Sequence, residues 1–120
     1  YISFEKGKYC EYEIGQMFMK SDLLVSPGNI GLNAVHSILY GTPVLTHGDF
    51  NNQMPECEII EEGFNGIFHE KDNLISLKAK IEQWFSSNFD SWNRDKIRKK
   101  LIKKYNPIYQ AAIIEKALFK

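Results

Sequence analysis

Short apolar runs alternate with longer amphipathic segments along this chain. The runs at residues 23–26, 44–46 and 67–68 hold no charged residue, and their length is typical of buried strands. Another apolar run, residues 2–4, predicts a further short strand. Because helical segments separate the strands, the pattern predicts an α/β fold with a parallel sheet flanked by helices.

Apolar residues at steps of three and four predict helices on either side of the central strands. The first covers residues 12–20, and its inward face consists of Ile14, Met17 and Phe18. The second covers residues 73–85, and five of its side chains are expected to pack in the core: Leu74, Leu77, Ile81, Trp84 and Phe85.

The segment between the first two central strands combines a glycine-bearing turn with a helix. Gly28 and Gly31 carry no Cβ, so a ligand can approach the backbone closely. The helix is expected to begin near Gly31 and to end at Gly41, since Pro43 cannot continue it. The first N–H groups of a helix lack intrahelical partners and favour a phosphate. Similar turns also occur where nothing binds, so the pattern alone leaves both interpretations open.

Charge is divided between two parts of the chain, although the total is zero. Residues 1–91 hold six Lys and Arg against thirteen Asp and Glu, a net charge of −7. Residues 92–120 hold nine against two, a net charge of +7. We therefore expect a domain over residues 1–90 and a basic helical C-terminal extension over residues 91–120 that packs on it.

The extension is predicted to contain two helices. Over residues 92–105, the apolar positions that share one face are Ile97, Leu101, Ile102 and Tyr105. Asn106 and Pro107 suit the cap and the first position of a final helix that ends near residue 119. A solvated helix packed on an acidic domain is the favoured interpretation, and attraction to anionic lipid is the second. Nucleic acid binding is disfavoured because no stacking aromatics alternate with the cations.

A series of short motifs resembles the donor-binding domain of B-type glycosyltransferases. The motifs are Asp-Leu-Leu-Val-Ser-Pro at 22–27, Gly-Leu at 31–32, Gly-Thr-Pro-Val at 41–44, Pro-Glu at 55–56 and Gly-Phe-Asn-Gly at 63–66. They are most similar to the large retaining group that contains many enzymes of bacterial polysaccharide biosynthesis. This resemblance covers about residues 1–85 and implies a Rossmann-like, nucleotide-sugar-binding C-terminal half. It also implies sugar transfer from a nucleotide-diphosphate sugar to a glycan or a lipid-linked acceptor.

The resemblance assigns donor-binding positions, two of which have changed in this chain. Most members carry a glutamate where Gly28 stands, which contacts the donor sugar, and another where His36 stands, which holds the ribose. Both carboxylates are absent here. Backbone amides that lie near the donor diphosphate in the family correspond to Asn29, Ile30, Gly31 and Leu32.

Asn33 and His36 are the candidate replacements for the missing glutamates. Both fall on one stripe of the predicted helix, and both can donate or accept hydrogen bonds to a hydroxyl. Alternatively, His36 is a partly buried residue that bonds a backbone carbonyl, and the sequence does not decide between the two.

His47 and Asp49 follow a central strand at the end where open α/β sheets bind ligands. They are candidates for sugar contacts or for an acid/base pair, and an ordinary polar loop is the favoured alternative. The three histidines are too scattered for a zinc site, and the family generally works without a bound metal. We expect no metal and no cofactor besides the nucleotide-sugar co-substrate, and no catalytic residue can be named.

Further expectations concern the protein as a whole. No apolar run reaches the roughly 20 residues that span a bilayer, so a cytoplasmic location is expected, with peripheral membrane contact through the basic extension. The chain is expected to be a C-terminal portion whose activity requires a missing N-terminal domain. Two other functions stay open: a nucleotide-sugar epimerase of related fold, and a degenerate, non-catalytic transferase domain, which the loss of both glutamates favours.

Overall fold

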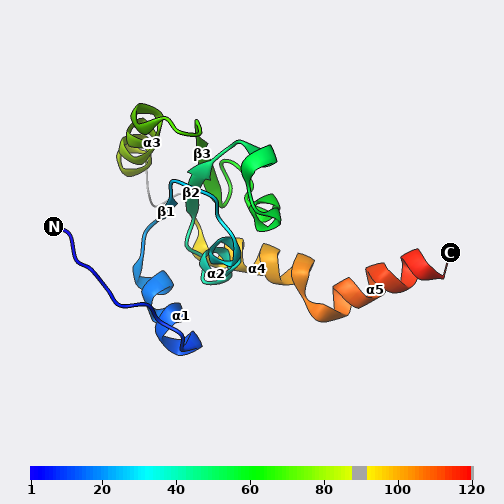
Figure 1. Cartoon of the computed structure of the whole chain (residues 1–120). Coiled ribbons are helices and arrows are strands. Elements are labelled where there is room, and N and C mark those ends of the chain that lie inside the picture. Colours follow the sequence, from blue (N-terminus) through cyan, green and yellow to red (C-terminus); the bar gives the residue numbers. More distant parts are fainter. Residues whose placement is uncertain (88–91, 120) are drawn as a thin grey trace.

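The computed structural model describes residues 1–87 and 92–119, and a three-stranded parallel sheet forms its centre (Figure 1). The strands are β1 (Leu24–Ser26), β2 (Val44–His47) and β3 (Gly66–His69), in the spatial order β1-β2-β3. All residues of the central strand β2 are buried, as expected for a parallel strand covered on both faces. The predicted α/β fold with a parallel sheet and flanking helices is confirmed, and each central strand matches its predicted range to within one residue at either end.

Helices connect and flank the strands throughout the described residues. They are α1 (Glu11–Lys20), α2 (Leu32–Leu39), α3 (Leu74–Ser86), α4 (Arg94–Tyr105), α5 (Pro107–Leu118) and the 3-10 helices η1 (Phe50–Asn52) and η2 (Pro55–Ile59). Three helices begin at an asparagine whose side-chain oxygen accepts a backbone N–H in the first turn: Asn73, Asn93 and Asn106. Such caps satisfy donors that would otherwise lack a partner, so they fix where each helix starts.

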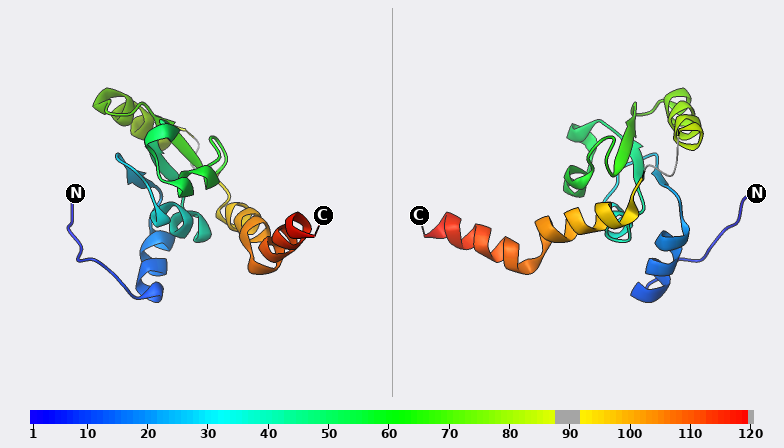
Figure 2. Two further views of the ribbon diagram at one scale, coloured as in Figure 1. Left: turned by 45° about the vertical axis from the view of Figure 1, so that its right-hand side comes forward. Right: turned by 180° about the vertical axis from the view of Figure 1, so that it is seen from behind.

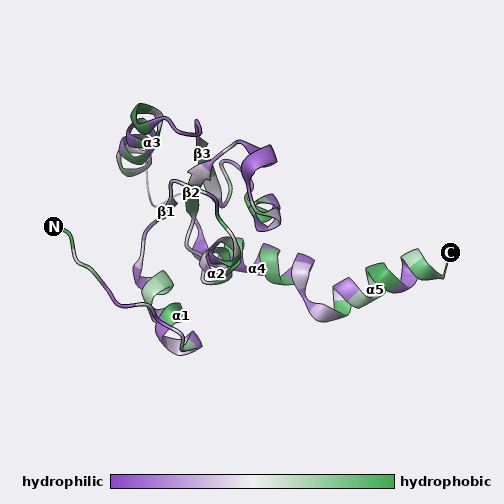
Figure 3. Cartoon of the chain, viewed as in Figure 1, coloured by the Kyte–Doolittle hydropathy of each residue, from purple (hydrophilic) through white to green (hydrophobic). Residues whose placement is uncertain are grey.

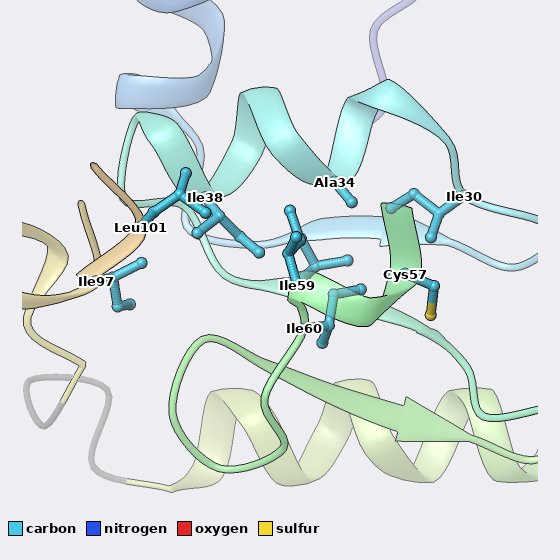
Figure 4. Close-up of a cluster of buried hydrophobic side chains, with 9 residues drawn as sticks. Ile30, Ala34, Ile38, Cys57, Ile59, Ile60, Ile97 and Leu101 are labelled. Carbon is cyan, nitrogen blue, oxygen red and sulfur yellow. The ribbon is translucent and has the colours of Figure 1, made fainter. Parts of the chain in front are cut away.

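The hydrophobic core lies where α2, η2 and α4 come together beside β2 (Figure 4). Ile38 from α2, Ile59 from η2 and Ile97 from α4 are all buried there. The apolar residues of three segments far apart in the sequence therefore depend on one another for burial, which makes α4 an integral part of the domain.

The strand predicted at residues 2–4 is wrong. Ile2 and Phe4 are 84% and 97% exposed, and residues 1–10 form no strand or helix. A strand needs a neighbour for its backbone N–H and C=O groups, and no strand of the described chain pairs with this segment. Apolar content alone was therefore insufficient to predict a strand there.

Some predicted core positions on the flanking helices are also wrong. On α3, Trp84 is buried, but Leu74 and Phe85 are 77% and 61% exposed. On α1, Met17 is 43% exposed, whereas Ile14 and Phe18 are half-buried. Helix α3 packs mainly on β3 and helix α1 mainly on α2, so the covered stripe is narrower than the apolar stripe in the sequence.

Helix α4 joins the basic extension to the rest of the domain. Ile97 and Leu101 are buried against α2, while Ile102 and Tyr105 are 46% and 42% exposed. Arg98 Nε donates to the Leu39 carbonyl over 2.9 Å, and Lys100 pairs with the Glu61 carboxylate. These contacts support the interpretation of a basic helix packed on an acidic domain.

Helix α5 projects away from the domain and buries none of its residues (Figures 1 and 2). Many of its residues are nevertheless apolar (Figure 3), and Ile108 and Leu118 are 84% and 71% exposed. The expectation that the extension packs on the domain thus fits α4 but not α5. No helix in the described residues is long and apolar enough to cross a membrane.

Candidate functional site

Three loops meet at one edge of the sheet. Because the strands are parallel, residues 27–31 after β1, 48–54 after β2 and 70–73 after β3 all leave from carboxyl ends. This edge is where open parallel sheets bind ligands. The register aligns Ser26 with Thr46 and His47 with His69, so the residues that begin these loops are neighbours in space.

The start of α2 presents unused hydrogen-bond donors at this edge. Within the described part of the chain, the backbone N–H groups of Gly31, Leu32 and Asn33 have no hydrogen-bond partner. Leu32 is 64% exposed and Asn33 is exposed as well, so a ligand can reach the first turn. These donors lie at the positive end of the helix dipole, an arrangement that favours an anion.

The backbone N–H of Ile30 was expected to face a diphosphate, but it already has a hydrogen-bond partner within the protein. Its N–H donates to Gln53 Oε1 over 2.9 Å, and its side chain is buried in the core. Ile30 therefore anchors the turn instead of offering its amide to a ligand. Of the backbone amides expected to bind a diphosphate, those on either side of Ile30 remain.

Gln53 fastens the turn to the central strand. Its Nε2 donates to Thr46 Oγ1 over 3.0 Å and to the His47 carbonyl over 3.1 Å. Thr46 Oγ1 in turn donates to the Gly28 carbonyl over 3.2 Å. Sequence reasoning missed Gln53, because a glutamine in a polar loop gives no sign of which distant backbone groups it will bond.

His47 is buried and holds the side chain of Asn29. The Asp49 backbone N–H donates to His47 Nδ1 over 3.3 Å, so the ring proton is on Nε2, which donates to Asn29 Oδ1 over 3.1 Å. Burial lowers the pKa of His47, and the nearby His69 and Lys71 lower it further. The ring is therefore neutral, and the two N–H donors of the Asn29 side-chain amide take no part in this hydrogen bond.

The acid/base pair considered for His47 and Asp49 is not formed. The Asp49 carboxylate accepts a hydrogen bond from Asn52 Nδ2 over 2.7 Å, and only the backbone of Asp49 reaches the imidazole. The arrangement orders the loop and gives no sign of proton transfer between the two side chains.

Asn33 and His36 lie on a different face of α2. They line a cavity of about 610 Å³ with residues of α1 and of the N-terminal segment, including Phe18 and Lys6. The half-buried ring of His36 makes no hydrogen bond to a backbone carbonyl within the described residues. The structure brings Gly28, Asn29, Gly31, His47 and Asp49 together at the sheet edge. Leu32 and Asn33 lie between this edge and the cavity, and His36 lies apart from the edge.

His69 is a buried residue of the edge that sequence reasoning did not select. It ends β3 beside His47, and the two ring centroids are 6.4 Å apart. Its position directly after the predicted strand at 67–68 was the available signal, the same signal that pointed to His47. Among the described residues, no group of three His, Cys, Asp or Glu side chains is arranged to hold a metal ion.

Comparison with known proteins adds no family assignment to this geometry. No protein-family model and no curated protein sequence matches the chain.

Proposed function

We propose that this chain is the donor-binding part of a retaining B-type glycosyltransferase, which transfers a sugar from a nucleotide-diphosphate sugar to a glycan or a lipid-linked acceptor. The observation that carries the proposal is the set of open amides at Gly31, Leu32 and Asn33, placed at the carboxyl edge of a parallel sheet. The ordered motifs along residues 22–66 support the same function, because they resemble that family.

The proposed contribution to catalysis is electrostatic. As the bond between sugar and phosphate breaks, negative charge grows on the leaving diphosphate. Donors that are already fixed toward this charge stabilise the transition state more than the ground state. Gln53 and Thr46 hold the turn in place before any ligand binds, and His47 orients the side-chain amide of Asn29. The donors therefore need little reorganisation when the ligand binds.

Position 32 offers a test that removes one donor and leaves the helix in place. Leu32 is the first residue of α2, where proline is well tolerated because its missing N–H is unpaired anyway. We expect Leu32→Pro to weaken binding of a nucleoside diphosphate about tenfold, the value of one hydrogen bond to a charged group. Leu32→Ala keeps the N–H and is the matched control. Equal affinities for the two variants, measured by calorimetry, would contradict the proposal.

A non-catalytic nucleotide-binding module is the second candidate, and two observations favour it. The Ile30 amide is already occupied by Gln53, and neither Gly28 nor His36 supplies the carboxylate of the family. The two functions can be distinguished on the intact enzyme. The assay measures release of nucleoside diphosphate from a sugar nucleotide in the presence of acceptor. Turnover that Leu32→Pro lowers and Leu32→Ala leaves unchanged supports the transferase, whereas binding without turnover supports the module.

A further inference from the structure

The Nε2 atom of His69 is a buried hydrogen-bond acceptor that nothing in the described chain uses. His69 is 5% exposed, and its Nδ1 donates to the Glu70 carbonyl over 2.7 Å. A carbonyl only accepts, so in the neutral ring the proton is on Nδ1 and the lone pair is on Nε2. This Nε2 has almost no contact with solvent and no hydrogen-bond partner.

The neighbouring histidine shows that the unused nitrogen is unusual. His47, paired with His69 in the sheet, uses both ring nitrogens in hydrogen bonds. A buried polar atom without a partner is destabilising, and natural proteins hold few of them. Such an atom at the ligand-binding edge of a sheet is therefore a candidate for contact with a ligand.

His69 is one of the residues that line a cavity of about 350 Å³ at the same edge. Its volume falls at the lower end of the range for small-molecule sites, about 300–1,000 Å³. Gly28 borders the cavity, and no atom lies within 4 Å of the place where its Cβ would be, so the space beside the turn is open. Asp72, which has a left-handed φ of 56°, also lines the cavity.

The composition of the wall suits a sugar ring. Pro27, Leu74 and Leu77 supply apolar surface for the C–H faces of a pyranose. His69 and the Asp72 carboxylate, one oxygen of which accepts from Lys71 Nζ, supply acceptors for its hydroxyls. A neutral histidine with its lone pair on Nε2 bonds a hydroxyl but not an ionised phosphate, which is itself only an acceptor. The cavity begins at Gly28, three residues before the first open amide of α2.

We propose that this cavity takes the sugar of the nucleotide-sugar donor and that His69 Nε2 accepts a hydrogen bond from one of the sugar hydroxyls. The inference rests on the proposed function, which places the diphosphate on the adjacent amides. His69 is then a residue that selects and positions the sugar. Nε2 has almost no contact with solvent, so a hydroxyl reaches it only when the residues around it move.

Two substitutions test the roles of the two ring nitrogens of His69 separately. His69→Asn retains an amide donor near Nδ1 and removes the acceptor at the Nε2 position, whereas His69→Gln retains a polar atom near Nε2. We would measure the affinities of UDP and UDP-glucose, and of GDP and GDP-mannose, by calorimetry on the 120-residue chain. We expect His69→Asn to weaken binding of the sugar nucleotide about five- to tenfold, the value of one hydrogen bond, and to leave the diphosphate unchanged. His69→Gln should retain most of the affinity for the sugar nucleotide.

The outcomes distinguish this inference from the proposed function. If the wild-type chain binds the diphosphates but His69→Asn changes neither ligand, or both equally, the role of His69 is wrong and the diphosphate site stands. If the wild-type chain binds none of the four nucleotides, the proposed function fails and the inference fails with it.

A second measurement needs no substitution at position 69. The nitrogen resonance of His69 Nε2 in the wild-type chain should move when UDP-glucose or GDP-mannose is added, and should stay in place with UDP or GDP. An unmoved resonance with a bound sugar nucleotide would overturn the proposal even where the His69 variants fail to fold.

Discussion

The two ends of α2 are built in opposite ways. At the C-terminal end, Gly41 N–H donates to the Ile38 carbonyl over 2.9 Å, and Arg98 donates to the Leu39 carbonyl over 2.9 Å. At the N-terminal end, the amides of Gly31 and Leu32 have no partner in the described chain. One helix thus combines an end closed by packing with an end left open at the sheet edge.

The difference shows where this domain places stability and where it keeps room for a ligand. Buried helix ends must have their polar groups satisfied, and the end near Gly41 meets this requirement through α4. Water can satisfy the other end, because Leu32 is 64% exposed. Substitutions at the closed end should therefore change stability, and substitutions at the open end should change binding.

The largest effect is expected where α4 packs on the closed end. Ile97→Ala removes a side chain that is 2% exposed, and we expect it to lower the free energy of unfolding by about 3–4 kcal/mol. The control Ile113→Ala lies on α5, where the side chain is 46% exposed, and should change stability by less than about 0.5 kcal/mol. Urea unfolding of both variants measures the difference. Similar losses would show that α5 packs on the domain in solution.

Gly41→Ala should be the next most destabilising change. Its φ of 75° is left-handed, and a Cβ would lie 2.7 Å from the Arg94 carbonyl oxygen. We expect a loss of about 3 kcal/mol, from backbone strain together with steric overlap. Gly63→Ala shares the left-handed φ, at 78°, but its Cβ would meet no atom within 4 Å, so about 1 kcal/mol is expected. A Gly63 variant as unstable as the Gly41 variant would refute the steric part of this account.

Gln53→Ala should have a moderate effect at the open end. The side chain makes three hydrogen bonds, to Ile30, Thr46 and His47, and its loss should cost about 1–2 kcal/mol. It should also weaken nucleotide binding, because the turn loses its attachment to β2. Asn52→Ala, which removes only an exposed contact with Asp49, should leave both properties nearly unchanged. Thermal melts and calorimetric titrations of the two variants provide the comparison.

Acid should lower the stability of the folded chain through protonation of His47. Burial holds the pKa of the folded ring below its ordinary value of 6.5, so the unfolded chain binds this proton first as the pH falls. The contribution of His47 is complete above pH 6.5 and declines below it, until the folded ring is also protonated. The decline cannot exceed about 1.4 kcal/mol per pH unit, the limit for one proton. Stability measured between pH 7 and pH 5 should fall more steeply in the wild-type chain than in His47→Gln, and parallel curves would contradict this assignment.

The sequence predicted the elements better than the contacts between them. Strand and helix positions follow from local patterns, and the Asn106 cap and Gly41 mark helix ends in the sequence itself. The strand expected at residues 2–4 failed because a strand depends on a partner elsewhere. Leu74 was placed in the core because periodicity shows which face is apolar but not what covers it.

The candidate site was predicted only in part for the same reason. The turn at residues 28–32 and the residue His47 were accessible from the rule that parallel strands bind ligands at their carboxyl ends. Gln53 and the occupied amide of Ile30 were not, because their hydrogen bond joins residues 23 positions apart. His69 follows a predicted strand as His47 does, but the sequence does not show that the register places it beside His47 or that its Nε2 has no partner in the described chain.

The most direct test of the central claim is a titration of the isotopically labelled chain with UDP, GDP, ADP and CDP, followed through its backbone amide resonances. The account predicts shifts concentrated at Gly31, Leu32 and Asn33, stronger for one base than for the others, and little change at Gly41 and Thr42 at the closed end of α2. Unchanged resonances at the three open amides with all four nucleotides, or shifts confined to the closed end, would contradict it.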